Sequence, residues 1–155
     1  MNRFLNKVVI KMRCDHLVSV VDWETETLTL RNIRTTVFIF EQQVPVDLEW
    51  DEFDIISTHF LVFNNHGEAV GTARLLPDGH IGRMAVLKEW RGKGYGSAIL
   101  KKILEELRQC HMQKAMLNAQ IDAVTFYEKF GFQKVSEEKF FEAGIPHIKM
   151  IIFLK

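Results

Sequence analysis

The chain has 155 residues, 47% hydrophobic and 26% charged, the balance of a globular protein of about one domain. Twenty basic and twenty acidic side chains leave no formal net charge, so no overall field draws the chain to nucleic acid or an anionic membrane. Recognition by charge must therefore be local. No linker, repeat or low-complexity tract divides the chain, and we expect one domain over residues 1–155, with residues 1–14 as a peripheral extension.

The N-terminal segment (MNRFLNKVVIKMRCDH) scatters charge among apolar runs of at most three residues, unlike a signal peptide or a membrane span. The two cysteines, Cys14 and Cys110, are too few for a disulfide scaffold and form no metal-type pair. Free thiols indicate a reducing compartment, so we expect a cytoplasmic protein.

The first predicted elements are a strand over residues 17–23 and a helix that Asp22 or Thr25 caps. Apolar residues then recur at helical spacing, and Pro45 ends the helix. Residues 45–57 are acidic and irregular, with a short helical turn. The predicted stripe consists of Leu30, Ile33, Val37, Phe40 and Val44.

An antiparallel meander is predicted next, because β-branched and aromatic runs alternate with turn signals. Its strands cover residues 59–63, 69–76 and 80–87. The turns fall at residues 64–67 (NNHG) and 77–79 (PDG).

A helix follows residues 90–97, and a strand is predicted over residues 115–119. The spacing of the apolar residues gives this helix one buried face. The predicted face consists of Ile99, Leu100, Ile103, Leu104 and Leu107.

The last predicted elements are a short helix and two strands. Asp122 caps the helix, which ends at Phe130 with Gly131 at the C′ position. The strands cover residues 132–138 and 148–153. The whole order indicates an α+β (mixed α/β) fold around a central, mostly antiparallel sheet with flanking helices.

Residues 90–97 (WRGKGYGS) place three glycines and two cations at the start of a helix. A helix N-terminus already carries about half a positive charge and unpaired N–H groups, so Arg91 and Lys93 are unfavourable there unless an anion binds. The glycines let the backbone turn tightly and approach a ligand. Within residues 83–97 the local charge is +3. We interpret this segment as a phosphate-binding loop; the alternative is a flexible, glycine-rich turn.

The residues Arg91-Gly92-Lys93-Gly94-Tyr95-Gly96 match R/Q-x-x-G-x-G/A, and the segment resembles the pyrophosphate loop of the GNAT superfamily of N-acyltransferases. The resemblance covers about residues 17–153 and is closest to the ElaA-like branch. The further matching segments are Val37-Phe38, Glu41-Gln42-Gln43-Val44-Pro45, Glu49-Trp50-Asp51, Gly82-Arg83-Met84-Ala85-Val86, Leu117-Asn118-Ala119-Gln120, Phe126-Tyr127-Glu128-Lys129-Phe130-Gly131-Phe132 and Glu142-Ala143-Gly144-Ile145-Pro146-His147.

The resemblance implies a GNAT-like fold, in which two central strands splay apart and form a cleft, and acetyl-CoA as co-substrate. It places the pyrophosphate on the loop and the pantetheine arm along the strand before it. The cofactor-binding residues that it implies are Met84, Ala85, Val86, Arg91, Gly92, Lys93, Gly94, Tyr95, Gly96, Ser97, Asn118, Phe126, Tyr127 and Lys129. Lys129 either reaches a CoA phosphate or is a solvated surface residue.

The implied reaction is direct attack of a primary amine on the thioester. Tyr127 is the candidate general acid, because a phenol with a pKa near ~10 keeps its proton at neutral pH. It lies about 100° from the face shared by Phe126 and Phe130, so it need not be buried with them. Asn118 either bonds the pantetheine or a water, or bonds only the backbone.

The general base is open among His147, Glu41 and His59, and a water molecule or no base at all are alternatives. His147 follows a rigid loop before the last strand, whereas Glu41 ends the first helix. His59 shares a strand face with apolar residues, where a satisfied, half-buried histidine is the default. Three further histidines, His16, His66 and His80, are interpreted as surface or turn residues.

Two functions of different classes fit these observations: an N-acetyltransferase, and a non-catalytic module that binds or senses acyl-CoA on the same fold. A binder of another nucleotide phosphate is a third alternative. Tyr127, Asn118 and the intact loop favour the enzyme. The acceptor is then a small-molecule or peptide amine, and the resemblance also allows a homodimer. Acidic residues at 47–54 either attract a cationic amine or form a solvated loop.

No spacing of His, Cys, Asp or Glu indicates a metal site. The basic residues are not interleaved with aromatic ones as in nucleic-acid-binding segments. We therefore expect neither a metal, nor nucleic acid, nor a membrane as a partner.

Overall fold

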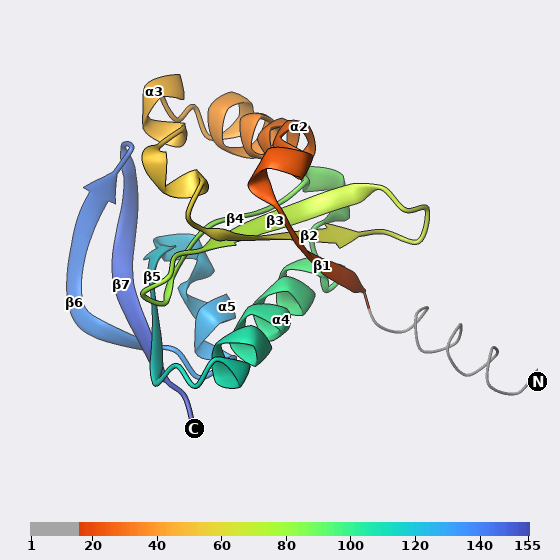
Figure 1. Ribbon diagram of the computed structural model, residues 1–155. Helices are drawn as coiled ribbons and strands as arrows, with labels where there is room; N and C mark the ends of the chain where they lie inside the picture. The colour runs from red at the N-terminus through yellow and green to blue at the C-terminus, as the bar shows by residue number, and fades with distance from the viewer. Residues whose placement is uncertain (1–15) are drawn as a thin grey trace, which may run out of the picture.

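The computed structural model describes residues 16–155, in which seven strands form one sheet in the order β1-β2-β3-β4-β5-β7-β6 (Figure 1). Neighbouring strands are antiparallel except for β4 and β5, which are parallel. The predicted mixed α/β order and the mostly antiparallel sheet are confirmed. Cys14 and the predicted N-terminal extension lie outside the described residues. The strands are β1 (Leu17–Val21), β2 (Thr58–Phe63), β3 (Ala69–Leu75), β4 (His80–Val86), β5 (Lys114–Gln120), β6 (Gln133–Glu142) and β7 (Ile145–Phe153).

Helices cover both faces of the sheet, because successive side chains of a strand point to opposite faces. On β2, Leu61 packs with helix α2 (Trp23–Arg34), whereas Phe60 packs with helix α4 (Tyr95–Gln109). Figure 1 shows these two helices on opposite sides of the strands. The predicted buried face of α4 is confirmed: Ile99, Leu100, Ile103, Leu104 and Leu107 are all buried.

Helix α2 begins as predicted, since the Asp22 carboxylate accepts a hydrogen bond from the backbone N–H of Thr25 at 3.2 Å. The helix continues into a π-helical turn over Thr35–Glu41. Each π-type bond spans one residue more than an α-helical bond, so the buried face shifts. Phe38 is therefore buried, and the prediction that Phe40 faces the core was wrong: Phe40 is 75% exposed.

The prediction that Pro45 ends this helix was also wrong. The helical turn ends at Glu41, and Pro45 instead precedes the one-turn helix α3 (Val46–Glu49). Its fixed φ suits the position just before a helix, where its missing N–H costs nothing. A 3₁₀ turn over Glu52–Asp54 follows, so the predicted irregular, acidic segment with a helical turn is confirmed.

A short helix, α5 (Val124–Glu128), follows β5. Asp122 does not cap it, because a 3₁₀ turn over Ile121–Ala123 leads into the helix without a side-chain cap. Gly131 has a φ of 100° just after the helix and donates its N–H to the Glu128 carbonyl, as predicted for a C-terminal glycine.

Strands β6 and β7 form a longer hairpin than the predicted strands 132–138 and 148–153. Ala143 and Gly144 have φ values of 51° and 77°, as in a two-residue hairpin turn. Ile145 and Pro146 therefore belong to β7, and the predicted rigid loop before His147 is part of a strand. Proline is tolerated there because the pairing of β5 with β7 ends at His147.

Strands β4 and β5 splay apart. Their pairing comprises only His80 with Met116 and Ile81 with Leu117. Beyond Ile81 the edge of β4 that faces β5 has no strand partner within residues 16–155. The expected split therefore lies at the centre of the sheet.

Candidate functional site

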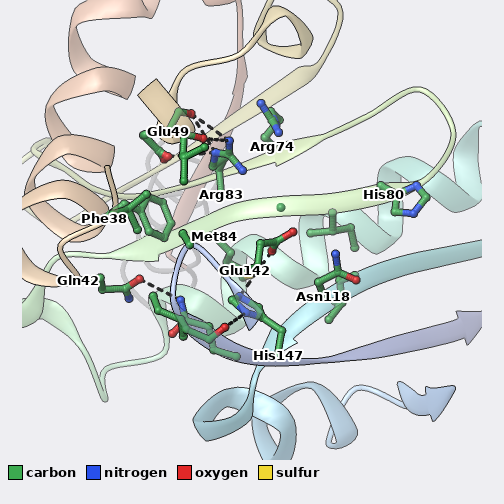
Figure 2. Close-up of a pocket in the computed structure, with 18 of the residues that line it drawn as sticks. Phe38, Gln42, Glu49, Arg74, His80, Arg83, Met84, Asn118, Glu142 and His147 are labelled. Atoms are coloured by element: carbon green, nitrogen blue, oxygen red, sulfur yellow. Dashed lines mark hydrogen bonds and ion pairs between the residues drawn. The ribbon is translucent and has the colours of Figure 1, made fainter. Parts of the chain in front are cut away.

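A cavity of about 570 Å³ occupies the split between β4 and β5 (Figure 2). Its size lies within the range of small-molecule sites. Phe38, from the layer of α2, and Tyr127, from helix α5, both line it. The cavity therefore joins the two faces of the sheet, so that two reactants could meet in it from opposite sides.

A β-bulge shapes the wall that β4 contributes. The register between β3 and β4 shifts after Thr72, and three successive residues, Gly82, Arg83 and Met84, all line the cavity. In a regular strand, successive side chains would alternate between the two faces. Arg83 has a φ of 48°, the left-handed conformation that bulges usually assign to glycine. The bulge turns both backbone and side-chain groups toward the split.

Tyr127 lies at the split and is only 9% exposed, although its position on α5 had not predicted burial. Its hydroxyl donates a hydrogen bond to the sulfur of Met84 at 3.4 Å. Burial raises the pKa of Tyr127 to about 12, so the phenol keeps its proton throughout the neutral range. Because a thioether is a weak acceptor, the proton is readily redirected to a stronger one.

His147 lies in the cavity wall on β7, with only 6% of its surface exposed. Its Nδ1 lies 2.7 Å from the carbonyl oxygen of Ile145. A carbonyl only accepts, so Nδ1 carries the proton and Nε2 keeps its lone pair in the neutral ring. Nε2 lies 3.7 Å from the carboxylate of Glu142 (Figure 2). Asn118, an exposed residue on β5, lines the same cavity.

The glycine loop leads directly into α4. Gly92 and Gly94 have φ values of 72° and 89°, which glycine adopts without strain. No side chain caps the helix, so the N–H groups of its first turn, including those of Gly96 and Ser97, are open to a ligand. These N–H groups and the helix dipole fit an anion such as pyrophosphate. Tyr95 contributes its backbone only, because its ring is buried in the core.

The charge of the loop is lower than predicted. Arg91 donates to the Val86 carbonyl at 2.8 Å and forms an ion pair with Glu41. Arg83 forms ion pairs with the acidic segment near α3. Both guanidinium groups thus have carboxylate partners that are distant in sequence. The other charged residues of this segment are Lys88, Lys93 and Glu89, which leave a local charge of +1. Anion binding by the loop therefore depends mainly on its backbone N–H groups.

His16, interpreted from the sequence as a surface or turn histidine, is half-buried and contacts the loop. Its Nε2 lies 2.6 Å from the carbonyl oxygen of Lys93, and its ring stacks on Tyr95 at 4.0 Å between centroids. The carbonyl of Lys93 and the N–H of Gly94 belong to one trans peptide and point in opposite directions. A bond to that carbonyl therefore fixes where the Gly94 N–H points.

Comparison with known proteins identifies the family. The acetyltransferase (GNAT) domain model matches residues 34–154, which contain the cavity and the loop. The chain belongs to the GNAT family. It is accordingly an acyl-CoA-dependent N-acyltransferase that uses acetyl-CoA or a related acyl-CoA and acts on an amine acceptor. This favours the enzyme over the non-catalytic alternative.

Several GNAT relatives span nearly the same length. The chain is 38% identical to the uncharacterized N-acetyltransferase YjcF of Bacillus subtilis over 77% of this chain and 86% of that protein. It is 34% identical to protein ElaA of Escherichia coli over 81% of this chain and 86% of that protein. The crystal structure of ElaA superposes with a TM-score of 0.76 at 30% identity, over 88% of this chain and 98% of that one. The predicted relationship to the ElaA-like branch is confirmed.

The other two candidate bases, His59 and Glu41, do not line the cavity between β4 and β5. His59 is 1% exposed, and its Nε2 lies 2.7 Å from the carbonyl oxygen of Asp54, as the default interpretation of a satisfied histidine predicted. Burial lowers its pKa. Hydrogen bonds from Arg91 lower the pKa of Glu41, which makes that carboxylate a weaker base. Of the three candidates, the structure brings only His147 into the cavity.

A basic groove of about 520 Å³ lies beside the loop, where Ser97 on α4 approaches Lys129 after α5. Lys101 and Arg108 also line it, and none of its lining residues is acidic. Phe126 packs beside the start of α4, since its ring lies 3.6 Å from the position that a Cβ on Gly96 would occupy. The surroundings of Lys129 thus suit a phosphate, and its role in binding one stays a prediction.

The acidic segment is only partly solvated: Asp47 and Glu52 are exposed, whereas Glu49 and Asp54 are buried. Its attraction for a cationic amine stays a prediction. Arg34 and Arg74, which sequence reasoning missed, are 1% and 5% exposed and form ion pairs with it. Burial raises the pKa of Glu49 despite its arginine partners. The sequence feature that could have predicted the burial of Arg34 is its position beside Ile33, in the apolar stripe of α2. The resulting ion-pair cluster consists of Arg34, Arg74, Arg83, Glu49, Asp51 and Asp54.

His80, predicted to be a turn histidine, also lines the cavity and bonds Asp78 at 2.9 Å. No three His, Cys, Asp or Glu side chains within residues 16–155 are arranged to hold a metal ion. In the same part of the chain, no helix is both long and apolar enough to cross a membrane.

Proposed function

We propose that this chain transfers the acetyl group of acetyl-CoA to a primary amine by direct attack, with Tyr127 as the general acid. One observation carries the proposal: a buried, protonated phenol lies at the β4–β5 split, in the wall of the cavity. Its nearest hydrogen-bond partner is Met84, on the strand along which the pantetheine arm would run.

The co-substrate enters from the side of α4. The N–H groups of the glycine loop bind its pyrophosphate, and the basic groove with Lys129 takes a further phosphate. The pantetheine arm pairs with the free edge of β4 at Met84–Val86, which brings the thioester to the split. Support for this path comes from the uncapped start of α4 and the unpaired edge of β4.

The acceptor amine enters from the side of α2 and α3. Its nitrogen attacks the thioester carbonyl, so a C–N bond forms and the C–S bond breaks. Backbone N–H groups near Val86 stabilise the oxyanion that develops between these events. The departing thiolate takes the proton of Tyr127, and Asn118 binds the pantetheine or an ordered water.

His147 is the general base in this proposal. Its Nε2 has a lone pair in the neutral ring and lies in the cavity wall. It accepts the proton that the amine loses on attack, either directly or through a water molecule. Glu142, 3.7 Å away, stabilises the imidazolium ion that results.

Replacement of Tyr127 by Phe tests the general acid. We expect kcat to fall by about a hundredfold or more, the usual contribution of a positioned acid, with little change in the Kd of acetyl-CoA. The ring still fills the same space, so the variant should fold, which circular dichroism would verify. An unchanged kcat would overturn the assignment.

Amines of different basicity test the base. A His147→Gln variant should lose most activity with amines that are protonated at the assay pH, and least with an amine that is already neutral. A Glu142→Gln variant serves as comparison, because it keeps the imidazole. Equal losses of kcat for all amines would exclude proton removal as the role of His147.

A further inference from the structure

Arg83 presents an unpaired donor to the acceptor side of the cavity. Its Nη2 donates to the carbonyl oxygens of Leu48 and Glu49 and to Asp51, at 3.0 to 3.3 Å. Its Nε donates to the Glu49 carbonyl at 3.3 Å and lies 3.0 Å from the carboxylate of the same residue. Among residues 16–155, Nη1 has no acceptor. The side chain lines the cavity and remains 24% exposed.

Arg74 adds a second unsatisfied donor to the same wall. Its side chain is 6% exposed, and both terminal nitrogens are used: Nη1 bonds Asp51 and Asp54, and Nη2 bonds Asp51. Its Nε is buried without any partner in the described chain. Buried donors in native proteins are nearly always paired, so an unpaired one indicates a missing oxygen acceptor.

The ion pairs of Arg83 do not by themselves explain why arginine occupies this position. Its φ of 48° would suit glycine, and any other residue is strained there. The Nε–Nη2 side of the guanidinium group holds the segment around α3. Nη1 is left without an acceptor among residues 16–155, on a side chain that lines the cavity.

The opposite polar group of the cavity is a carboxylate. Glu142, on the β6–β7 hairpin, is 56% exposed, and no lysine or arginine of residues 16–155 pairs with it. The titratable side chain next to it is His147, itself the candidate base. Figure 2 shows the two groups on different walls, with Arg83 beside Glu49 and Glu142 beside His147.

We propose that the acceptor is a primary amine that also carries a carboxylate, as an amino acid does. Its carboxylate accepts a charge-assisted hydrogen bond from Nη1 of Arg83. Its amino group lies beside Glu142 and His147, where it is deprotonated and attacks the thioester. This inference rests on the proposed acetyl transfer and adds the class of acceptor. A purely cationic amine has no oxygen that could accept this hydrogen bond.

A matched set of acceptors tests the proposal: phenylalanine, its amide and phenethylamine, which share one side chain and differ only at the carboxylate. We expect kcat/KM, measured by CoA release, to be at least about tenfold higher for the amino acid than for the other two. A second set of amino acid, amide and decarboxylated amine, built on an aliphatic side chain, controls for how well the aromatic ring fits the cavity. An equal or higher kcat/KM for the decarboxylated amines, or for a polyamine, would overturn the inference.

Two variants test whether Arg83 is responsible. Arg83→Gln should make kcat/KM about equal for phenylalanine and phenethylamine. Arg83→Lys should keep part of the preference for the amino acid, since lysine keeps the charge but loses the planar fork. Retained acetyl-CoA affinity and an unchanged circular dichroism spectrum would show that each variant is folded. A preference that survives in a folded Arg83→Gln variant would exclude Arg83 as the carboxylate-binding residue.

A binding measurement separates this inference from the proposed reaction. If no amine releases CoA, the proposed acetyl transfer fails. The carboxylate preference is then read from the Kd of N-acetylphenylalanine and N-acetylphenethylamine, titrated into wild type and Arg83→Gln in the presence of CoA. Tighter binding of the acid to wild type alone supports the inference, and equal Kd values in both proteins contradict it.

Discussion

Glu41 binds Arg91 through both carboxylate oxygens, at 2.6 and 2.7 Å from its two terminal nitrogens. The pair joins the end of the π-helical turn to the loop that precedes α4. Arg91 also donates to the carbonyl of Val86, at the end of β4. Glu41 thus contacts the co-substrate loop rather than the cavity, which suits a residue that positions the loop.

A Glu41→Gln variant should therefore weaken acetyl-CoA binding slightly and leave chemistry nearly intact. Both side chains of the pair are more than one-third exposed, and such pairs contribute about 0–1 kcal/mol, which is up to about fivefold in Kd. Titration calorimetry at low and high salt would check this, because salt screens exposed pairs. A fall in kcat of about a hundredfold with unchanged Kd would instead identify Glu41 as the base.

A Gly94→Val variant should lose CoA binding but stay folded. Gly94 has a φ of 89°, and a Cβ there would lie 3.1 Å from Nε2 of His16. A branched side chain would force the loop to change conformation and would redirect the N–H groups that face the ligand.

The matched control for this variant is Gly67→Val. Gly67 has a similar φ of 77° in the turn between β2 and β3, and no atom lies within 4 Å of the position that a Cβ would occupy there. Both variants should lose about 1–3 kcal/mol of stability through backbone strain. Only Gly94→Val should lose CoA affinity in titration calorimetry; equal losses of affinity would point to general destabilisation.

The buried ion-pair cluster predicts a large loss of stability for Arg34→Ala. The change leaves Glu49 and Asp54, each 2% exposed, without this partner. Removing one member of a buried pair costs about 3–5 kcal/mol. Urea denaturation would measure the loss as a lower midpoint with an unchanged slope.

Arg31→Ala is the control for that experiment. Arg31 and Arg34 both place their guanidinium carbon 4.8 Å from the ring of Trp50, but Arg31 is exposed and lies outside the ion-pair cluster. Loss of its cation–π contact should cost below about 1 kcal/mol. If the two variants lost equal stability, stacking on Trp50 rather than ion pairing would explain the effect.

The sequence predicted features that depend on local spacing. The buried face of α4, the turn at Gly131 and the loop after Trp90 follow from residue order and backbone geometry alone, and all three lie where expected. The Asp22 cap is of the same kind, because its partner is three residues away. Such features need no knowledge of the rest of the fold.

Features that depend on distant partners were missed. The π-helical turn moved Phe40 to the surface, and the bulge in β4 placed Arg83 in the cavity wall. The sequence places Glu49 in an acidic segment that could be solvated. In the structure Glu49 is buried and pairs with Arg34, which lies fifteen residues earlier in the chain. These outcomes depend on how α2, α3 and the sheet pack together, which spacing within one segment does not encode.

Tyr127 should make stability depend on pH in the alkaline range. Its pKa is raised to about 12 in the folded protein by burial, against about 10 in the unfolded chain. Above about pH 10 the unfolded state loses this proton first, so the free energy of unfolding falls as pH rises, and the fall ends near the folded pKa. The difference of about two pKa units corresponds to a loss of about 3 kcal/mol in the free energy of unfolding.

The difference between wild type and Tyr127→Phe isolates this effect from other titrating groups. Urea denaturation of both proteins at about pH 8 and at about pH 11 should show wild type losing more stability than the variant between the two values. Below about pH 10 the difference should be constant, because the phenol is neutral in both states. A constant difference up to about pH 11 would mean that the hydroxyl ionises as freely in the folded protein as in the unfolded chain, which would contradict the raised pKa of Tyr127.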